Sequence, residues 1–131
     1  MSSEANKQLV RGAVEAWLAG DGGAIFRLLD DNVHWTVIGT TQISRTYNSR
    51  KDFVDGALKP LGALLGGPIS PTIVNILADG EHVVLQWDGD GTMTSGKPYM
   101  NRYCWVMRFD DEKVVEGVAY LDTALVASLF D

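Results

Sequence analysis

Residues 99–109 read YMNRYCWVMRF, a run in which aromatic, polar and aliphatic side chains follow one another without a glycine or proline. Successive side chains of a β-strand point to opposite faces, so this run predicts a long strand with two distinct faces. One face combines aromatic surface with hydrogen-bonding groups, as a pocket for a small, partly apolar ligand requires. The same residues would also suit a core or a dimer interface from which polar tips reach water. The members of this face are Tyr99, Asn101, Tyr103, Trp105 and Met107.

The residues on either side of this strand predict further antiparallel strands. Residues 71–78 and 82–87 flank Asp79-Gly80, a dipeptide that strongly favours a β-hairpin. After the acidic turn at residues 110–112, residues 114–121 predict the last strand. The second half of the chain is therefore expected to be a meander of long strands.

The first half of the chain has helical periodicity. Apolar residues between 5 and 19 recur at three- and four-residue spacing, and Gly20 ends the pattern. Further elements are expected as helices over 24–29, 51–65 and 123–130 and as a strand over 33–38. The third helix is expected to be interrupted near Pro60. Because helices come first and antiparallel strands follow, the sequence predicts an α+β fold in one domain spanning residues 1–131.

Composition and charge exclude several classes of protein. With 131 residues, of which 46% are apolar and 21% charged, the chain can bury a core without disulfides. Its 17 acidic and 11 basic residues give a net charge of −6, which disfavours nucleic acid and anionic membranes as partners. The single cysteine, Cys104, excludes a disulfide scaffold and is expected to be a small buried apolar group. No stretch predicts a signal peptide or a membrane helix, so the cytoplasm is the expected compartment.

The landmarks of this pattern occur in a defined order along nearly the whole chain. They are Trp17 with Gly20-Asp21, Val33-His34-Trp35, Tyr47 with Arg50, Asp79-Gly80, the strand from Tyr99 to Trp105, Lys113-Val114-Val115-Glu116 and Tyr120-Leu121-Asp122. Together they resemble the NTF2-like superfamily, in its SnoaL-like, polyketide cyclase-like branch. The resemblance implies a cystatin-like cone, in which N-terminal helices pack on a curved antiparallel sheet, with an apolar pocket in its mouth and usually a homodimer. The superfamily holds isomerases, cyclases, epoxide hydrolases and binding proteins, so the fold leaves the activity open.

Asp122 lies between the last predicted strand and the last predicted helix. In SnoaL-like cyclases and limonene-epoxide hydrolases, an aspartate at the matching place acts as general acid or base, so the resemblance implies this role for Asp122. A partly dehydrated carboxylate beside Tyr120 and Leu125 would suit proton transfer. The alternative is a helix cap, because Asp122 directly precedes residues 123–126.

Asp88 resembles the second aspartate of the epoxide-hydrolase site and is the second catalytic candidate. The arginine of that site lies two residues earlier, where this chain has Gln86, which disfavours epoxide hydrolysis. Asp88 also begins Asp-Gly-Asp-Gly, which suits a bulge or turn with solvated carboxylates. The ketosteroid isomerase pattern is incomplete as well, because Trp17 and His34 stand on the elements where that family has a tyrosine and an aspartate. His34 is a possible base or a surface group.

Ligand-binding residues are expected on several elements. They are Trp35, Tyr47, Tyr99, Asn101, Tyr103 and Tyr120. The sequence favours a cofactor-free isomerase or aldol-type cyclase that moves a proton on a small, mostly apolar substrate. The alternatives are a binding protein that leaves its ligand unaltered and an epoxide hydrolase. No metal or nucleotide cofactor is expected, because a complete ligand set and a glycine-rich phosphate motif are both missing. The expected partners are a small apolar or amphipathic ligand and a second copy of the chain.

Overall fold

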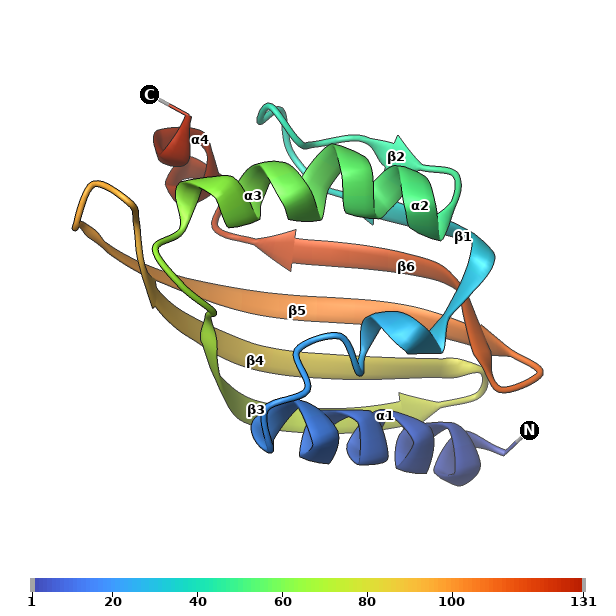
Figure 1. Cartoon of the computed structure of the whole chain (residues 1–131). Helices are drawn as coiled ribbons and strands as arrows, with labels where there is room; N and C mark the ends of the chain where they lie inside the picture. The colour runs from blue at the N-terminus through green and yellow to red at the C-terminus, as the bar shows by residue number, and fades with distance from the viewer. Residues whose placement is uncertain (1, 131) are drawn as a thin grey trace.

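Six strands form one sheet in the computed structural model, which describes residues 2–130 (Figure 1). They are β1 (Leu29–Val37), β2 (Thr46–Tyr47), β3 (Ser70–Asp79), β4 (His82–Thr92), β5 (Pro98–Asp110) and β6 (Lys113–Leu121). Within the sheet they lie in the order β2-β1-β6-β5-β4-β3. Every neighbouring pair is antiparallel except β1 and β6, which run parallel. The strands β3 to β6 are the predicted meander.

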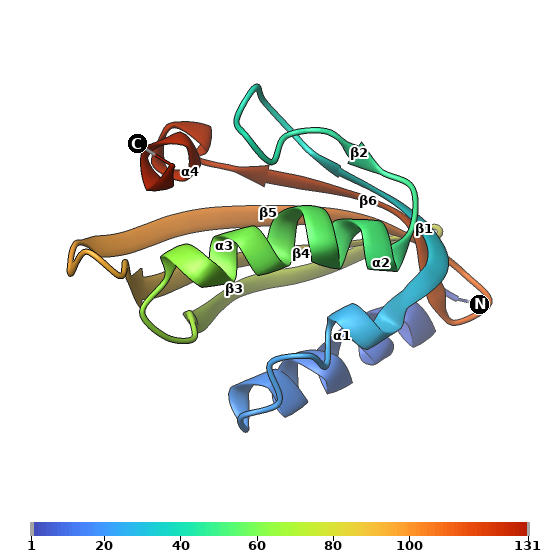
Figure 2. The ribbon, with the colours of Figure 1, turned by 45° about the horizontal axis from the view of Figure 1, so that its top comes forward.

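Helices lie against one face of this sheet, which bends around them (Figure 2). They are α1 (Ser3–Leu18), the 3-10 turn η1 (Phe26–Leu28), α2 (Arg50–Phe53), the π-helical turn η2 (Val54–Leu58), α3 (Lys59–Leu64) and α4 (Thr123–Leu129). This arrangement confirms the predicted α+β fold with helices packed on a curved antiparallel sheet. Within residues 2–130, no helix combines the length and the apolar character needed to cross a membrane.

The predicted helix over residues 24–29 is wrong. Only the short turn η1 forms there, and β1 already begins at Leu29. Leu29 is 1% exposed and pairs with Val114 of β6. Burial of this side chain in the sheet therefore overrides the helical spacing of the local sequence.

The predicted helix over residues 51–65 does not break at Pro60. Instead α2, η2 and α3 follow one another without a gap, and we call this continuous segment, residues 50–64, the wall helix. Proline has no N–H, so the carbonyl of Gly56, four residues earlier, loses its α-helical donor. The helix widens into the π turn just before Pro60. The Tyr47 hydroxyl, whose one hydrogen is directed mainly to the Ile43 carbonyl at 2.6 Å, lies 3.3 Å from the Gly56 carbonyl and makes a weaker second contact there.

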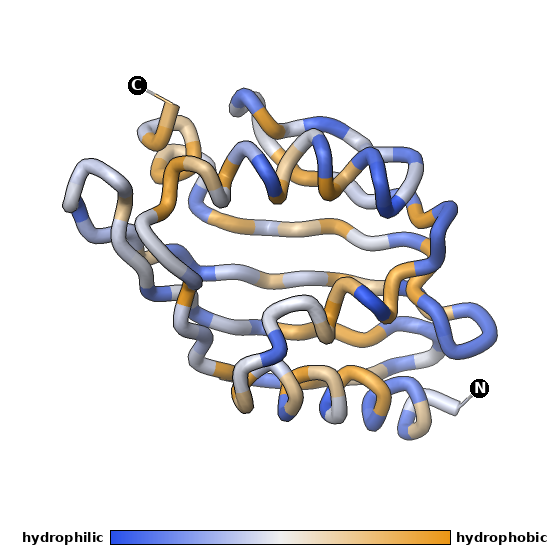
Figure 3. The backbone as a smooth tube through the Cα atoms, viewed as in Figure 1, coloured by the Kyte–Doolittle hydropathy of each residue, from blue (hydrophilic) through white to orange (hydrophobic). Residues whose placement is uncertain are grey.

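The register of the strands decides which side chains face the helices. On β5 the alternation predicted from the sequence is confirmed, because Tyr99, Asn101, Tyr103, Trp105 and Met107 are all buried. The residues between them are half-buried or exposed. Figure 3 shows apolar residues along the strands, α1 and the wall helix. Each of these elements contributes buried side chains to the hydrophobic core.

The opposite face of the sheet, which we call the outer face, carries an apolar stripe across four strands. Leu77 pairs with Val84, Val84 with Val106, and Val106 with Val118. Leu77 is 55% exposed, and two further outer-face side chains are about half exposed: Tyr120 on the next row, and Met100 farther along β5. The helices α1 to α3 lie on the other side of the sheet (Figures 1 and 2).

The strands β2 and β3 form the two edges of the sheet. The edge strand β2 pairs with β1 over only two residues. On β3 the register shifts between Ile73 and Asn75, so Val74 has no partner on β4 and is 47% exposed. This extra residue is a β-bulge in an edge strand.

Candidate functional site

A cavity of about 300 Å³ lies between the inner face of the sheet and the wall helix. Its lining is apolar and rich in aromatic side chains, and all four tryptophans of the chain contribute. Within residues 2–130 the lining includes no carboxylate, histidine or cysteine. The aromatic lining residues are Trp17, Phe26, Trp35, Phe53, Trp87, Tyr99, Tyr103 and Trp105.

The aromatic rings hold one another in place. Trp87 stacks on Tyr103, with ring centroids 4.1 Å apart and planes 9° from parallel. Trp105 meets the edge of Trp87 at 5.2 Å. On the other side, Trp35 stacks on Phe53 of the wall helix at 5.2 Å. Each such pair adds about 0.5–1.5 kcal/mol beyond the burial of its area, so these contacts preform the cavity.

Two strand glycines make room for these rings. A Cβ atom on Gly117 would overlap Cε3 and Cζ3 of Trp35, so the indole lies directly on the β6 backbone. A Cβ atom on Gly89 would lie 2.9 Å from Cζ3 of Trp87 and 3.1 Å from Cε2 of Tyr103. Any larger residue at either position would push an aromatic ring into the cavity.

The polar groups at the cavity form a short chain on β5. The hydroxyls of Tyr99 and Tyr103 are 2.8 Å apart, and the Asn101 amide nitrogen donates to the Tyr99 hydroxyl at 2.9 Å. Tyr99 and Tyr103 line the cavity, whereas Asn101 lies behind them at 1% exposure. Burial raises the pKa of the Tyr103 hydroxyl, and the neighbouring Tyr99 raises it further. Tyr103 therefore stays protonated near neutral pH and can donate a hydrogen bond.

Asn101 also joins β5 to the start of α4. Its amide oxygen accepts from the backbone N–H groups of Arg102 (2.8 Å) and Asp122 (2.9 Å). Its nitrogen donates to the Asp122 carbonyl at 3.2 Å as well as to Tyr99. The side chain thus continues the hydrogen bonding between β5 and β6 for one more pair after β6 ends. All of the amide's principal hydrogen-bonding groups are satisfied, as a buried amide requires.

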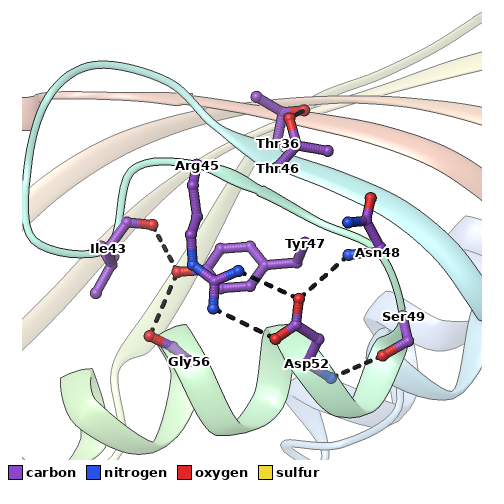
Figure 4. A network of polar contacts seen from close by, with 9 residues as sticks. All are labelled: Thr36, Ile43, Arg45, Thr46, Tyr47, Asn48, Ser49, Asp52 and Gly56. Carbon is purple, nitrogen blue, oxygen red and sulfur yellow. Dashed lines mark hydrogen bonds and ion pairs between the residues drawn. The ribbon is translucent and has the colours of Figure 1, made fainter.

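Tyr47 does not line the cavity but supports the wall helix from behind (Figure 4). Its hydroxyl donates to the Ile43 carbonyl at 2.6 Å, with the Gly56 carbonyl as a weaker second acceptor at 3.3 Å. Burial raises the pKa of this hydroxyl. The Arg45 guanidinium lies 4.0 Å from the centre of the Tyr47 ring and pairs with Asp52 at 3.2 Å. Hydrogen bonding to Arg45 lowers the pKa of the Asp52 carboxyl, so this pair is charged at neutral pH.

Asp122 lies outside the cavity lining, at the N-terminus of α4. One carboxylate oxygen accepts from the backbone N–H groups of Ala124 (3.1 Å) and Leu125 (3.3 Å). The residue is exposed. This geometry is that of a helix cap, the alternative that the sequence left open.

Removing the Asp122 cap should destabilise the fold by about 1 kcal/mol. We therefore expect Asp122→Ala to lower the free energy of urea unfolding by this amount. Asp122→Asn should stay close to wild-type stability, because its amide oxygen can still accept the two hydrogen bonds. Asp90→Ala, at an exposed strand position, is the control for removing a surface carboxylate. Equal destabilisation by the alanine and asparagine variants at position 122 would contradict the capping role.

The other candidates outside the cavity have side chains on the outer face. Asp88 alternates with the buried Trp87 and Gly89, and pairs across the strands with Arg102. Tyr120 is 46% exposed, and His34 is exposed. Cys104, expected to be buried, is half-buried on this face because no helix covers it. Of the predicted ligand-binding residues, the structure therefore brings only Trp35, Tyr99 and Tyr103 to the cavity.

Sequence reasoning missed the contribution of the wall helix. Phe53, Ala57 and Leu61 line the cavity at four-residue spacing, one above the other on the same helix face. This spacing was visible in the sequence. However, the expected break at Pro60 separated Leu61 from the other two.

Comparisons with known proteins support this fold. Residues 10–117 match the profile of the SnoaL-like domain, whereas no curated protein matches the sequence. An NTF2-like protein from Burkholderia thailandensis is 24% identical, with a TM-score of 0.80 over 100% of this chain and 99% of that one. Bal32a, from a soil-derived mobile gene cassette, is 21% identical, with a TM-score of 0.81 over 98% of both chains. TerC, co-crystallized with polyporic acid, is 16% identical, with a TM-score of 0.77 over 95% of this chain and 96% of that one.

At these identities the solved structures show the shared fold alone. The profile match is different, because it rests on the sequence and spans most of the chain. The chain therefore belongs to the SnoaL-like family, and its fold is that of the NTF2-like proteins.

Proposed function

We propose that the protein binds a small, uncharged and largely aromatic molecule in the cavity between the sheet and the wall helix. The observation that carries this proposal is the lining itself, in which four tryptophans and two tyrosines surround about 300 Å³. Apolar walls with a few placed polar groups are the usual composition of a small-molecule site. A charged ligand would lose its hydration there without finding an opposite charge.

Binding is better supported than proton transfer by a carboxylate. The sequence favoured Asp122 and Asp88 for this chemistry. In the structure, the Asp122 side chain caps α4, and the Asp88 side chain lies on the outer face. Among residues 2–130, the only ionisable side chains in the lining are the two tyrosines, and burial raises the pKa of Tyr103. A neighbour of the same fold, TerC, was co-crystallized with polyporic acid, which supports a small organic ligand for this fold.

The tryptophans provide a direct test of ligand binding. Because all four line the cavity, energy transfer from tryptophan to N-phenylnaphthylamine should rise and saturate as this apolar dye is added. We expect Leu61→Lys, which places a charge in the wall, to weaken binding by roughly tenfold or more. Leu18→Lys is the matched control, because Leu18 is 57% exposed at the end of α1 and lies outside the lining. Absence of saturable transfer, or equal loss in both variants, would refute binding in this cavity.

We further propose that a second copy of the chain covers the outer face. The stripe from Leu77 to Val118 crosses four strands, and uncovered sheet faces of this kind commonly pack on another sheet. The rows beside the stripe carry both signs of charge, including the Arg108–Glu116 ion pair, so a two-fold related copy meets no uniform repulsion.

Sedimentation tests this interface. Wild-type protein should sediment as a dimer at micromolar concentration, and Val106→Glu, at the centre of the stripe, should sediment as a monomer. Arg11→Glu, an exposed change on α1, should leave the dimer intact. A wild-type monomer would refute the proposal.

A further inference from the structure

The orientation of the Asn101 amide is fixed by its backbone partners. Its oxygen accepts from two backbone N–H groups, those of Arg102 and Asp122, so this end cannot be the amide nitrogen. The nitrogen must then face the Asp122 carbonyl and the Tyr99 hydroxyl, at 3.2 and 2.9 Å. Consequently the Tyr99 oxygen accepts a hydrogen bond from Asn101.

The direction of the next hydrogen bond follows from counting hydrogens. Having accepted from Asn101, the Tyr99 hydroxyl still holds one hydrogen, and Tyr99 is 1% exposed. Among residues 2–130 its remaining partner is the Tyr103 hydroxyl at 2.8 Å. If Tyr103 were the donor instead, the Tyr99 hydrogen would be buried without an acceptor, which costs free energy. The lower-energy arrangement runs from Asn101 to Tyr99 to Tyr103.

This arrangement leaves the Tyr103 hydrogen without an acceptor in the described part of the chain. Tyr103 lines the cavity and is 9% exposed, Tyr99 lines it at 1% exposure with its hydroxyl against that of Tyr103, and Asn101 lies behind both. We propose that Asn101, Tyr99 and Tyr103 form a donor relay that offers one polarised O–H group to the ligand, so that the site selects aromatic molecules with an acceptor oxygen such as a ketone or quinone carbonyl. This inference rests on the proposed binding function and names the ligand class.

Two features support the relay. Hydrogen bonds in a chain polarise one another, so Tyr103 is a better donor than an isolated phenol. Trp87 covers one face of the Tyr103 ring at 4.1 Å and holds the hydroxyl in position. The relay thus specifies where on the wall the carbonyl oxygen of a ligand lies.

A matched pair of ligands separates this inference from the binding proposal. Tetralone and tetralin share one bicyclic skeleton and differ only by a carbonyl oxygen. We expect calorimetry on wild-type protein to show tetralone binding about fivefold to tenfold more tightly than tetralin, as one buried hydrogen bond predicts. Equal affinities would overturn the relay and leave apolar binding standing. Binding of neither compound would overturn both.

Two tyrosine variants locate the effect. Tyr103→Phe should abolish the preference for tetralone while tetralin binds as in wild type. Tyr47→Phe is the matched control, because it also removes a buried hydroxyl but one that donates to backbone carbonyls behind the wall helix. It should keep the preference. A tetralone preference that survives in Tyr103→Phe would overturn the relay, and the wild-type comparison decides the question if either variant fails to fold.

Discussion

Gly117→Val is expected to lower the free energy of unfolding by about 3 kcal/mol or more. Gly117 is buried on β6, and even a Cβ atom there would overlap the six-membered ring of Trp35. The indole has little freedom to move away, because it stacks on Phe53 at 5.2 Å and meets Trp105 at 5.5 Å. The strain must therefore be relieved by shifting the wall helix or the sheet. A loss of this size corresponds to a fall in Tm of roughly 10 °C for a domain of this length.

Urea unfolding followed by circular dichroism measures this loss. Gly91→Ala is the control, because it adds a side chain to β4, where the nearest atom, Cγ1 of Ile69, lies at an ordinary contact distance of 3.5 Å. This variant should change stability by less than about 1 kcal/mol. If Gly117→Val unfolds like wild type, Trp35 does not lie on the β6 backbone as described.

Asn101→Leu is expected to cost about 2–4 kcal/mol, although leucine has nearly the same size. The substitution leaves the backbone N–H of Asp122 without its partner and removes the donor to the Tyr99 hydroxyl. Both groups are inside the protein, so water cannot replace the lost bonds without reorganisation. The start of α4 should loosen as well, because Asn101 holds both the N–H and the carbonyl of Asp122.

Two measurements check the second expectation. Urea unfolding gives the stability, and amide hydrogen exchange should show faster exchange in α4 than in the wild type. Asn75→Leu is the matched control, because Asn75 is exposed and makes a single side-chain bond to Gln86 at 2.9 Å. Equal stability of Asn101→Leu and Asn75→Leu would show that the buried amide is dispensable.

Local periodicity predicted the strands well. The alternation in residues 99–109 depends only on backbone geometry, so the faces of β5 could be assigned before the fold was known. The predicted helix over 24–29 was wrong because Leu29 belongs to β1 and pairs with Val114, which is distant in sequence. The wall helix continues through Pro60 by widening into a π turn, which the periodicity of the sequence does not indicate.

The candidate site was predictable only in part, for a related reason. Which residues face inward on a strand is local information, and it led to Tyr99 and Tyr103. Whether Asp122 enters a cavity or caps a helix is decided by the direction of the chain after β6. The same Asp-Thr-Ala-Leu sequence suits both outcomes, and only the bonds to Ala124 and Leu125 distinguish them.

The bulge at Val74 has a consequence for how copies of this chain meet. An exposed sheet edge can recruit a strand from another molecule and grow into an aggregate. Here the bulge interrupts the ladder of β3, Pro71 lacks an N–H to offer, and the opposite edge is the two-residue β2. Both borders therefore resist strand addition, so the proposed second copy would meet this chain through the outer face of the sheet and not through its edges.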